Sequence, residues 1–192
     1  MSAILRQAVV GDANAIAALH IKSWQTAYRG QLPDRVLDNL SGELERRTEF
    51  WREHISTVPS GKHEIWVADV EDQVESQLSG FAALGPARDK DLGTGELYAI
   101  YVHPDRWRHG LGRALLAHAT RRISALGYAN AILWVLESNI RARTFYERAG
   151  WTPDGGTKIE TLPDHVELRE VRYRIRCRQE NEESCRKEVG SF

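Results

Sequence analysis

Two glycines, Gly110 and Gly112, stand one residue apart in the stretch VHPDRWRHGLGRALL, residues 102–116. An apolar run ends just before them, and a helix-forming pattern begins with them. The first amides of a helix have no partner within the helix, and its dipole favours an anion there by roughly 0.3 to 2 kcal/mol. The spacing therefore predicts a phosphate cradle made of backbone amides. A tight strand-to-helix turn without a ligand would give the same pattern.

The known nucleotide-binding signatures do not match this stretch. Leu115 occupies the third glycine position of the dinucleotide motif G-x-G-x-x-G, which also belongs near the first strand of a βαβ unit. No Lys-Ser or Lys-Thr pair follows a glycine at the Walker spacing. An S-adenosylmethionine or nucleotide enzyme would need an acidic and glycine-rich motif that is missing, so these classes rank below the others.

Apolar periodicity predicts the elements that position the glycines. The first half of the chain indicates a helix from Asp12, as N-cap, to Gly30, and a second helix from Pro33 with a break at Ser41-Gly42. Strands are expected at 4–8, 64–70 and 78–84, and the last two form a hairpin. The second half indicates an interior strand at 96–102 that His103-Pro104 ends, and an amphipathic helix from Gly112 to Gly127. Then follow a buried strand at 131–136, a short helix between Asn139 and Gly150, and closing strands at 157–162 and 166–176.

Two segments, ELYAIYVHPDRWRHGLGRALLAHA and LWVLESNIRARTFYERAGW, together resemble the acyl-CoA-binding core of the GNAT superfamily of N-acetyltransferases. The family's first signature is Gln or Arg, two variable residues, Gly, one variable residue, and Gly or Ala. Trp107 departs from it by standing where the family has Gln or Arg, and Arg108 stands where a glycine is common. The second signature matches at Asn139, Ala142, Phe145, Tyr146, Gly150 and Trp151.

The resemblance implies a single α/β domain over residues 1–176, with a mixed central sheet of about seven strands and helices on both faces. Residues 177–192 are polar and are expected to form a disordered tail. Acetyl-CoA is the implied co-substrate, and because backbone amides hold its pyrophosphate, the Trp107 departure need not abolish binding. The implied cofactor-binding residues are Ile100, Tyr101, Val102, Arg108, His109, Gly110, Leu111, Gly112, Arg113, Asn139 and Ala142.

The resemblance also assigns the chemistry. Tyr146 is the implied general acid for the leaving thiolate, and a phenol of pKa ~10 donating to a thiolate of pKa ~8.5 costs only about 2 kcal/mol. Glu96 is the implied base, with Glu137 or solvent as alternatives. A base matters for a lysine-like acceptor, whose deprotonation at pH 7 costs roughly 4.6 kcal/mol, and hardly for an α-amine, at about 1 kcal/mol. Without a catalytic role, Tyr146 would be part of an apolar helix face, and Asn139 would be a plain N-cap.

The resemblance places the acceptor across the sheet from the phosphates, beside SWQTAYRG, residues 23–30. Tyr28 and Arg29 are the candidates for substrate contacts, although Trp24 and Tyr28, four residues apart, would equally form a core stripe. The expected activity is transfer of an acetyl group from acetyl-CoA to a primary amine by direct attack in a ternary complex, without a metal. The alternative class is a non-catalytic acyl-CoA-binding sensor or regulatory module.

The composition and net charge of the chain limit the partners and the location that we expect. The 192 residues are 42% hydrophobic, which suits one packed domain, and a net charge of −1 gives no overall field for nucleic acid or an anionic membrane. No stretch is typical of a secretory signal or a spanning helix, so we expect a cytoplasmic protein. Cys177 and Cys185 match no zinc or disulfide pattern. The expected partner is a small-molecule or protein amine, and a homodimer is one expected assembly because GNAT-like domains often pair.

Overall fold

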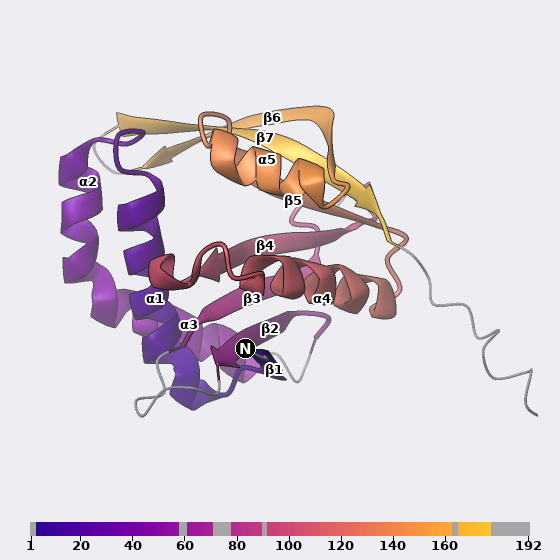
Figure 1. Cartoon of the computed structure of the whole chain (residues 1–192), viewed down its shortest axis with the longest axis horizontal. Helices are drawn as coiled ribbons and strands as arrows, with labels where there is room; N and C mark the ends of the chain where they lie inside the picture. Colours follow the sequence, from indigo (N-terminus) through magenta and orange to yellow (C-terminus); the bar gives the residue numbers. More distant parts are fainter. Residues whose placement is uncertain (1–2, 58–60, 71–77, 90–91, 163–164, 178–192) are drawn as a thin grey trace, which may run out of the picture.

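The computed structural model describes residues 3–57, 61–70, 78–89, 92–162 and 165–177, which contain a seven-stranded mixed sheet (Figure 1). Its strands are β1 (Ala3–Gln7), β2 (Glu64–Val70), β3 (Gly80–Pro86), β4 (Gly95–Val102), β5 (Asn130–Leu136), β6 (Thr152–Leu162) and β7 (Val166–Arg176). Their order is β1-β2-β3-β4-β5-β7-β6. Only β4 and β5 run parallel, and the other neighbours are antiparallel.

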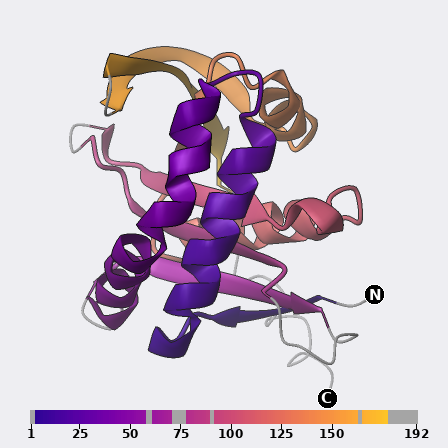
Figure 2. The same ribbon diagram turned by 90° about the vertical axis from the view of Figure 1, so that its left-hand side faces the viewer.

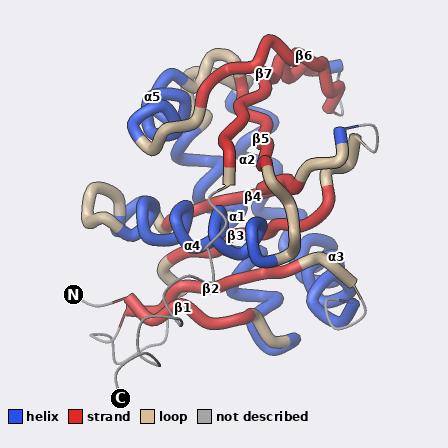
Figure 3. The backbone as a smooth tube through the Cα atoms, turned by 90° about the vertical axis from the view of Figure 1, so that its right-hand side faces the viewer, coloured by secondary structure: helices blue, strands red, loops and turns tan. Residues whose placement is uncertain are grey.

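Helices cover both faces of the sheet, which confirms the expected α/β architecture. They are α1 (Ala13–Ala27), α2 (Asp34–Asn39), α3 (Leu44–Thr57), α4 (Leu111–Ala125) and α5 (Ile140–Arg148), with short 3-10 turns at Val10–Asp12, Leu40–Glu43 and Pro104–Arg106. Figure 2 shows α1, α2 and α3 in front of one face. Figure 3 shows α4 across β3 and β4 on the other face, with α5 beside β5 and β7. The turn at Leu40–Glu43 confirms the expected break at Ser41-Gly42.

Three apolar clusters of the described residues hold the helices to the sheet, and two of them lie around β4. Between α4 and the sheet, Leu115, Ile123 and Leu133 are almost completely buried. Between α1, α3 and the opposite face, Ile16 and Phe81 have no exposed surface. Complete burial of one such side chain contributes about 1.5–3 kcal/mol, so both helix layers are firmly attached around β4. Each described helix is too short or too polar to cross a bilayer.

The sequence predicts Asp12 and Asn139 as helix N-caps, and only Asn139 caps its helix with its side chain. The Asn139 side chain accepts a hydrogen bond from the Ala142 amide at 3.1 Å and so begins α5 as predicted. Asp12 occupies the N-cap position of α1, but its carboxylate accepts the Val9 amide at 2.8 Å and pairs with Arg6 at 2.7 Å. Asp12 is therefore the N-cap residue as predicted, but its side chain makes no capping hydrogen bond, because Arg6 and the Val9 amide hold the carboxylate.

The sequence predicts Cys177 as the first residue of the tail, but Cys177 belongs to the packed domain. It is 4% exposed, and its amide donates to the Ala129 carbonyl at 2.9 Å. Residues 178–192, which include Cys185, lie outside the described residues.

Candidate functional site

β4 and β5 pair over three residues only and then separate (Figure 1). The paired residues are Gly95–Leu97 on β4 and Ala131–Leu133 on β5. A β-bulge follows at Tyr98, because β3 pairs Leu84 with Leu97 but Ala83 with Ala99. The rest of β4 thus has no strand partner on its β5 side. An open strand edge can pair with an extended polar ligand, so the predicted residues Ile100, Tyr101 and Val102 lie where such a ligand would bind.

The glycine turn follows directly on the open end of β4. Two of its residues have left-handed backbone, Gly110 with φ +82° and Arg108 with φ +68°. No side chain caps α4 at Gly110, so the amides of Leu111, Gly112 and Arg113 keep their hydrogen-bonding capacity for another acceptor. The turn therefore presents a set of donors at the positive end of a helix.

The charges around this turn also suit an anion. The first turns of α4 and α5 contain no acidic residue, although acids are the residues that a helix dipole favours there. Arg113 and Arg141 occupy those turns instead. In the described part of the chain, no acidic side chain pairs with Arg108, Arg113 or Arg141, and His109 lies exposed beside them. Unpaired donors and cations of this kind fit phosphate groups.

Tyr146 lies in α5 with 8% of its surface exposed. Its ring lies 6.5 Å from that of Trp151 and 6.3 Å from that of Tyr173, and its hydroxyl makes no hydrogen bond to the described residues. Burial and, to a smaller extent, the Tyr101 hydroxyl raise the pKa of Tyr146 above 10.0. This phenol stays protonated and has an uncommitted proton to donate.

Tyrosines from α1 and β4 approach Tyr146. The Trp24 ring N–H donates to the Tyr101 hydroxyl at 2.8 Å, and the rings of Trp24 and Tyr28 are 5.0 Å apart. Burial raises the pKa of Tyr28, and the hydroxyls of Tyr101 and Tyr146 raise it further. The hydroxyls of Tyr28 at the C-cap of α1, Tyr101 on β4 and Tyr146 on α5 are therefore close enough to influence one another's pKa. We call Tyr28, Tyr101 and Tyr146 the tyrosine cluster.

Arg29, the second predicted acceptor contact, is exposed at the end of α1. It forms ion pairs with Asp34 at 2.9 Å and Asp38 at 2.8 Å. Its guanidinium is therefore shared with two carboxylates.

The predicted base Glu96 is a buried, paired carboxylate. Its side chain has no exposed surface, and it accepts the Arg88 backbone amide at 2.8 Å and the Arg88 Nε at 2.9 Å. The alternative base, Glu137, is exposed at the end of β5. Glu96 is thus held by an arginine from the β3–β4 connection, which the sequence pattern did not indicate.

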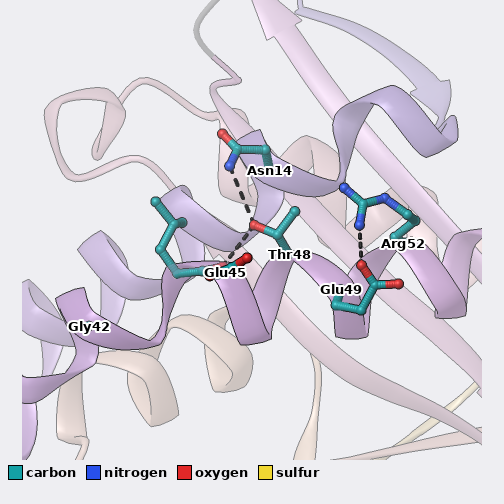
Figure 4. Close-up of a pocket in the computed structure, with 7 residues that line it drawn as sticks. Asn14, Gly42, Glu45, Thr48, Glu49 and Arg52 are labelled. Carbon is teal, nitrogen blue, oxygen red and sulfur yellow. Dashed lines mark hydrogen bonds and ion pairs between the residues drawn. The ribbon is translucent and has the colours of Figure 1, made fainter.

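A separate hollow of about 460 Å³ lies between α1 and α3 (Figure 4). Its lining residues are Asn14, Gly42, Leu44, Glu45, Thr48, Glu49 and Arg52. Two polar pairs lie there, since Asn14 donates to Thr48 at 3.4 Å and Arg52 pairs with Glu49. None of the predicted site residues lines it. Within the described ranges, no group of three or more His, Cys, Asp or Glu residues could hold a metal ion.

Comparison with known proteins gives the family. Residues 21–151 match the model of the Acetyltransferase (GNAT) family, and the chain belongs to this family. It is 35% identical over 136 residues to an uncharacterized N-acetyltransferase of Bacillus subtilis, YuaI, covering 70% of this chain and 72% of the relative.

Solved structures share the fold. PaiA N-acetyltransferase from Thermoplasma acidophilum, in complex with coenzyme A, has a TM-score of 0.69 at 18% identity over 92% of this chain and 99% of that one. YncA from Salmonella typhimurium, with its cofactor acetyl-CoA, has a TM-score of 0.66 at 18% identity over 93% and 95%. The family and the fold that the sequence predicted are therefore confirmed.

Proposed function

We propose that this protein transfers an acetyl group from acetyl-CoA to a primary amine by direct attack in a ternary complex. One observation carries the proposal: the turn before α4 has helix N-terminal amides without a side-chain cap, β4 has an open edge, and α5 holds a buried phenol without a hydrogen bond to the described residues. These three features correspond to the diphosphate, the pantetheine arm and the thiol of acetyl-CoA. Family membership and the coenzyme A and acetyl-CoA complexes of proteins with this fold support the same co-substrate.

The chain's own residues would divide the binding between backbone and side chains. The amides of Gly110, Leu111, Gly112 and Arg113 would hold the diphosphate, with charge from Arg108 and Arg113. The backbone of Ile100–Val102 would pair with the amide groups of the pantetheine arm. Asn139 and Ala142, at the start of α5, would contact the same ligand.

In the reaction, the amine nitrogen forms a bond to the thioester carbonyl carbon and the carbon–sulfur bond breaks. A β4 amide would stabilise the negative charge on the carbonyl oxygen, a contribution of about 3 kcal/mol in comparable sites. Tyr146 would protonate the departing thiolate. The proton lost by the amine would pass to Glu96, to Glu137 or to solvent, and Glu96 would first have to loosen from Arg88.

We propose that the amine enters on the α1 side of β4, beside the tyrosine cluster and Arg29. Tyr28 would border the amine, and Arg29 would contact a polar group of the acceptor if Asp34 or Asp38 releases it. A lysine-like acceptor would need a base to remove its proton, whereas an α-amine would hardly need one.

Isothermal titration with acetyl-CoA, CoA and S-adenosylmethionine tests the co-substrate. We expect saturable micromolar binding of the two CoA species and none of S-adenosylmethionine. A panel of amines followed by thiol release then tests the transfer. Binding without acetylation of any amine would support the non-catalytic acyl-CoA-binding module instead, and no binding would contradict both proposals.

A further inference from the structure

Trp107 is fixed to the end of β4. Its ring N–H donates to the Val102 carbonyl at 2.8 Å, and Val102 is the last residue of the strand. The indole lies between the strand end and the glycine turn, at the position where the family signature has Gln or Arg. The residue that departs from the signature is therefore held in a defined orientation.

The face of this indole carries an arginine from another element. The guanidinium carbon of Arg141, in the first turn of α5, lies 3.4 Å from the centroid of the Trp107 ring. A guanidinium stacked in this way contacts the ring through its face and keeps the N–H groups at its edge for other acceptors. Stacking also restricts the long side chain before a ligand binds, so the side chain loses fewer conformations on binding.

The stacked arginine lies in a cationic environment. Partial burial lowers the pKa of Arg141, and the charge of Arg108 lowers it further. No acidic side chain of the described residues neutralises either one. Two cations kept close together without a counter-ion are unfavourable unless an anion binds between or beside them.

We propose that Trp107 is a positioning residue that holds Arg141 as a phosphate-binding residue of the acyl-CoA site. The proposal rests on the acetyl-CoA-dependent function above and adds two residues to it. The ligand chemistry is a phosphate ester of CoA, either the diphosphate or the 3′-phosphate. In this chain, the stacked pair would supply hydrogen-bond donors in place of the Gln or Arg that the signature has at position 107.

The test compares binding of CoA and 3′-dephospho-CoA by isothermal titration in single variants. We expect Arg141→Gln to weaken CoA binding about tenfold and Trp107→Leu to weaken it by a similar factor. Trp107→Phe keeps an aromatic face and should remain within about threefold of the natural protein. In the double variant Trp107→Leu/Arg141→Gln, the loss should be no greater than in Arg141→Gln, because both changes act through one group.

Arg148→Gln is the matched control, since it removes the same charge from the last turn of the same helix. It should leave both affinities unchanged. If Arg141→Gln abolishes the preference for CoA over 3′-dephospho-CoA, the contact is to the 3′-phosphate. If it weakens both ligands equally, the contact is to the diphosphate.

Three outcomes would overturn the inference. The first is a folded Trp107→Leu protein, checked by thermal melting, that binds CoA as well as the natural protein. The second is an Arg148→Gln protein weakened as much as Arg141→Gln. The third is a natural protein that binds no CoA species, which would overturn the proposed function as well, whereas the first two would leave it intact.

Discussion

Arg88 holds both carboxylate oxygens of Glu96, through its backbone amide on Oε2 at 2.8 Å and its guanidinium Nε on Oε1 at 2.9 Å. The carboxylate is completely buried, whereas the Arg88 side chain is 60% exposed. A carboxylate bound in this way can accept a proton only if it gives up part of that pairing. Whether Glu96 acts as a base or only fixes the β3–β4 connection therefore depends on Arg88.

Glu96→Gln is expected to change the acidic limb of the pH profile of kcat/KM for a lysine-like acceptor. The limb should hardly change for an α-amine acceptor, because less free energy is needed to deprotonate it. Glu137→Gln is the matched control at the end of β5. An unchanged profile in Glu96→Gln would assign the base to Glu137 or to solvent.

Arg88→Gln tests the same pair from the other side. It removes the guanidinium but keeps the backbone amide that donates to Glu96. If Glu96 is the base, Arg88→Gln should lower kcat/KM for a lysine-like acceptor, because the guanidinium no longer holds the carboxylate in its position. An unchanged kcat/KM in Arg88→Gln, measured on the same acceptor, would speak against a role of Glu96 in the reaction.

Tyr146→Phe is expected to lower kcat about 100-fold while acetyl-CoA binding stays within about twofold, because the hydroxyl acts on the leaving sulfur. The raised pKa of Tyr146 also predicts that its ionisation causes no loss of activity below about pH 10. Tyr173→Phe is the control, since that neighbouring hydroxyl is engaged with Arg143 and Glu147. It should lower stability more than turnover. Unchanged turnover in Tyr146→Phe would remove Tyr146 from the mechanism.

The two glycines of the turn should respond to alanine in opposite ways. A Cβ at Gly112 would meet only Phe145 at 3.6 Å and Val102 at 3.7 Å, which are ordinary contacts, and alanine favours a helix by about 1 kcal/mol over glycine. Gly112→Ala should therefore keep or raise stability and leave acetyl-CoA affinity within about threefold, because the family signature has either Gly or Ala at this position.

Gly110→Ala is the companion variant. Gly110 has a left-handed backbone with φ +82°, so an alanine there should lower the free energy of unfolding by about 1–2 kcal/mol. Urea unfolding and isothermal titration on both variants separate the two effects. A loss of about tenfold in acetyl-CoA affinity in Gly112→Ala would mean that the ligand needs the space that the methyl group fills.

Apolar faces and apolar runs predicted the helices and most of the strands, and the glycine turn was predicted because backbone requirements are local; β6 begins at Thr152, before the predicted 157, since it is largely exposed. The role proposed for Arg141 also has a signal in the sequence, since a basic residue in the first turn of a helix opposes the dipole. The Arg88–Glu96 pair was not accessible, because it depends on how the β3–β4 connection folds back. The tyrosine cluster joins residues more than 40 positions apart, and no local pattern predicts such a contact.

The stability of the fold should itself depend on pH through Glu64, which is 8% exposed in its side chain on β2. Burial acts to raise the pKa of Glu64, but hydrogen bonds from Arg122 and Trp66 outweigh it and leave the pKa below 4.5. A lowered pKa gives stability that is complete above the unfolded value and is lost as the pH falls through the folded value. Glu64→Gln should therefore cost about 1–3 kcal/mol at pH 7, and the difference from the natural protein should shrink as the pH falls below about 4. Urea unfolding across this range measures it, with the exposed pair variant Glu49→Gln as the control, and a difference that stays constant with pH would show that the charge of Glu64 contributes nothing.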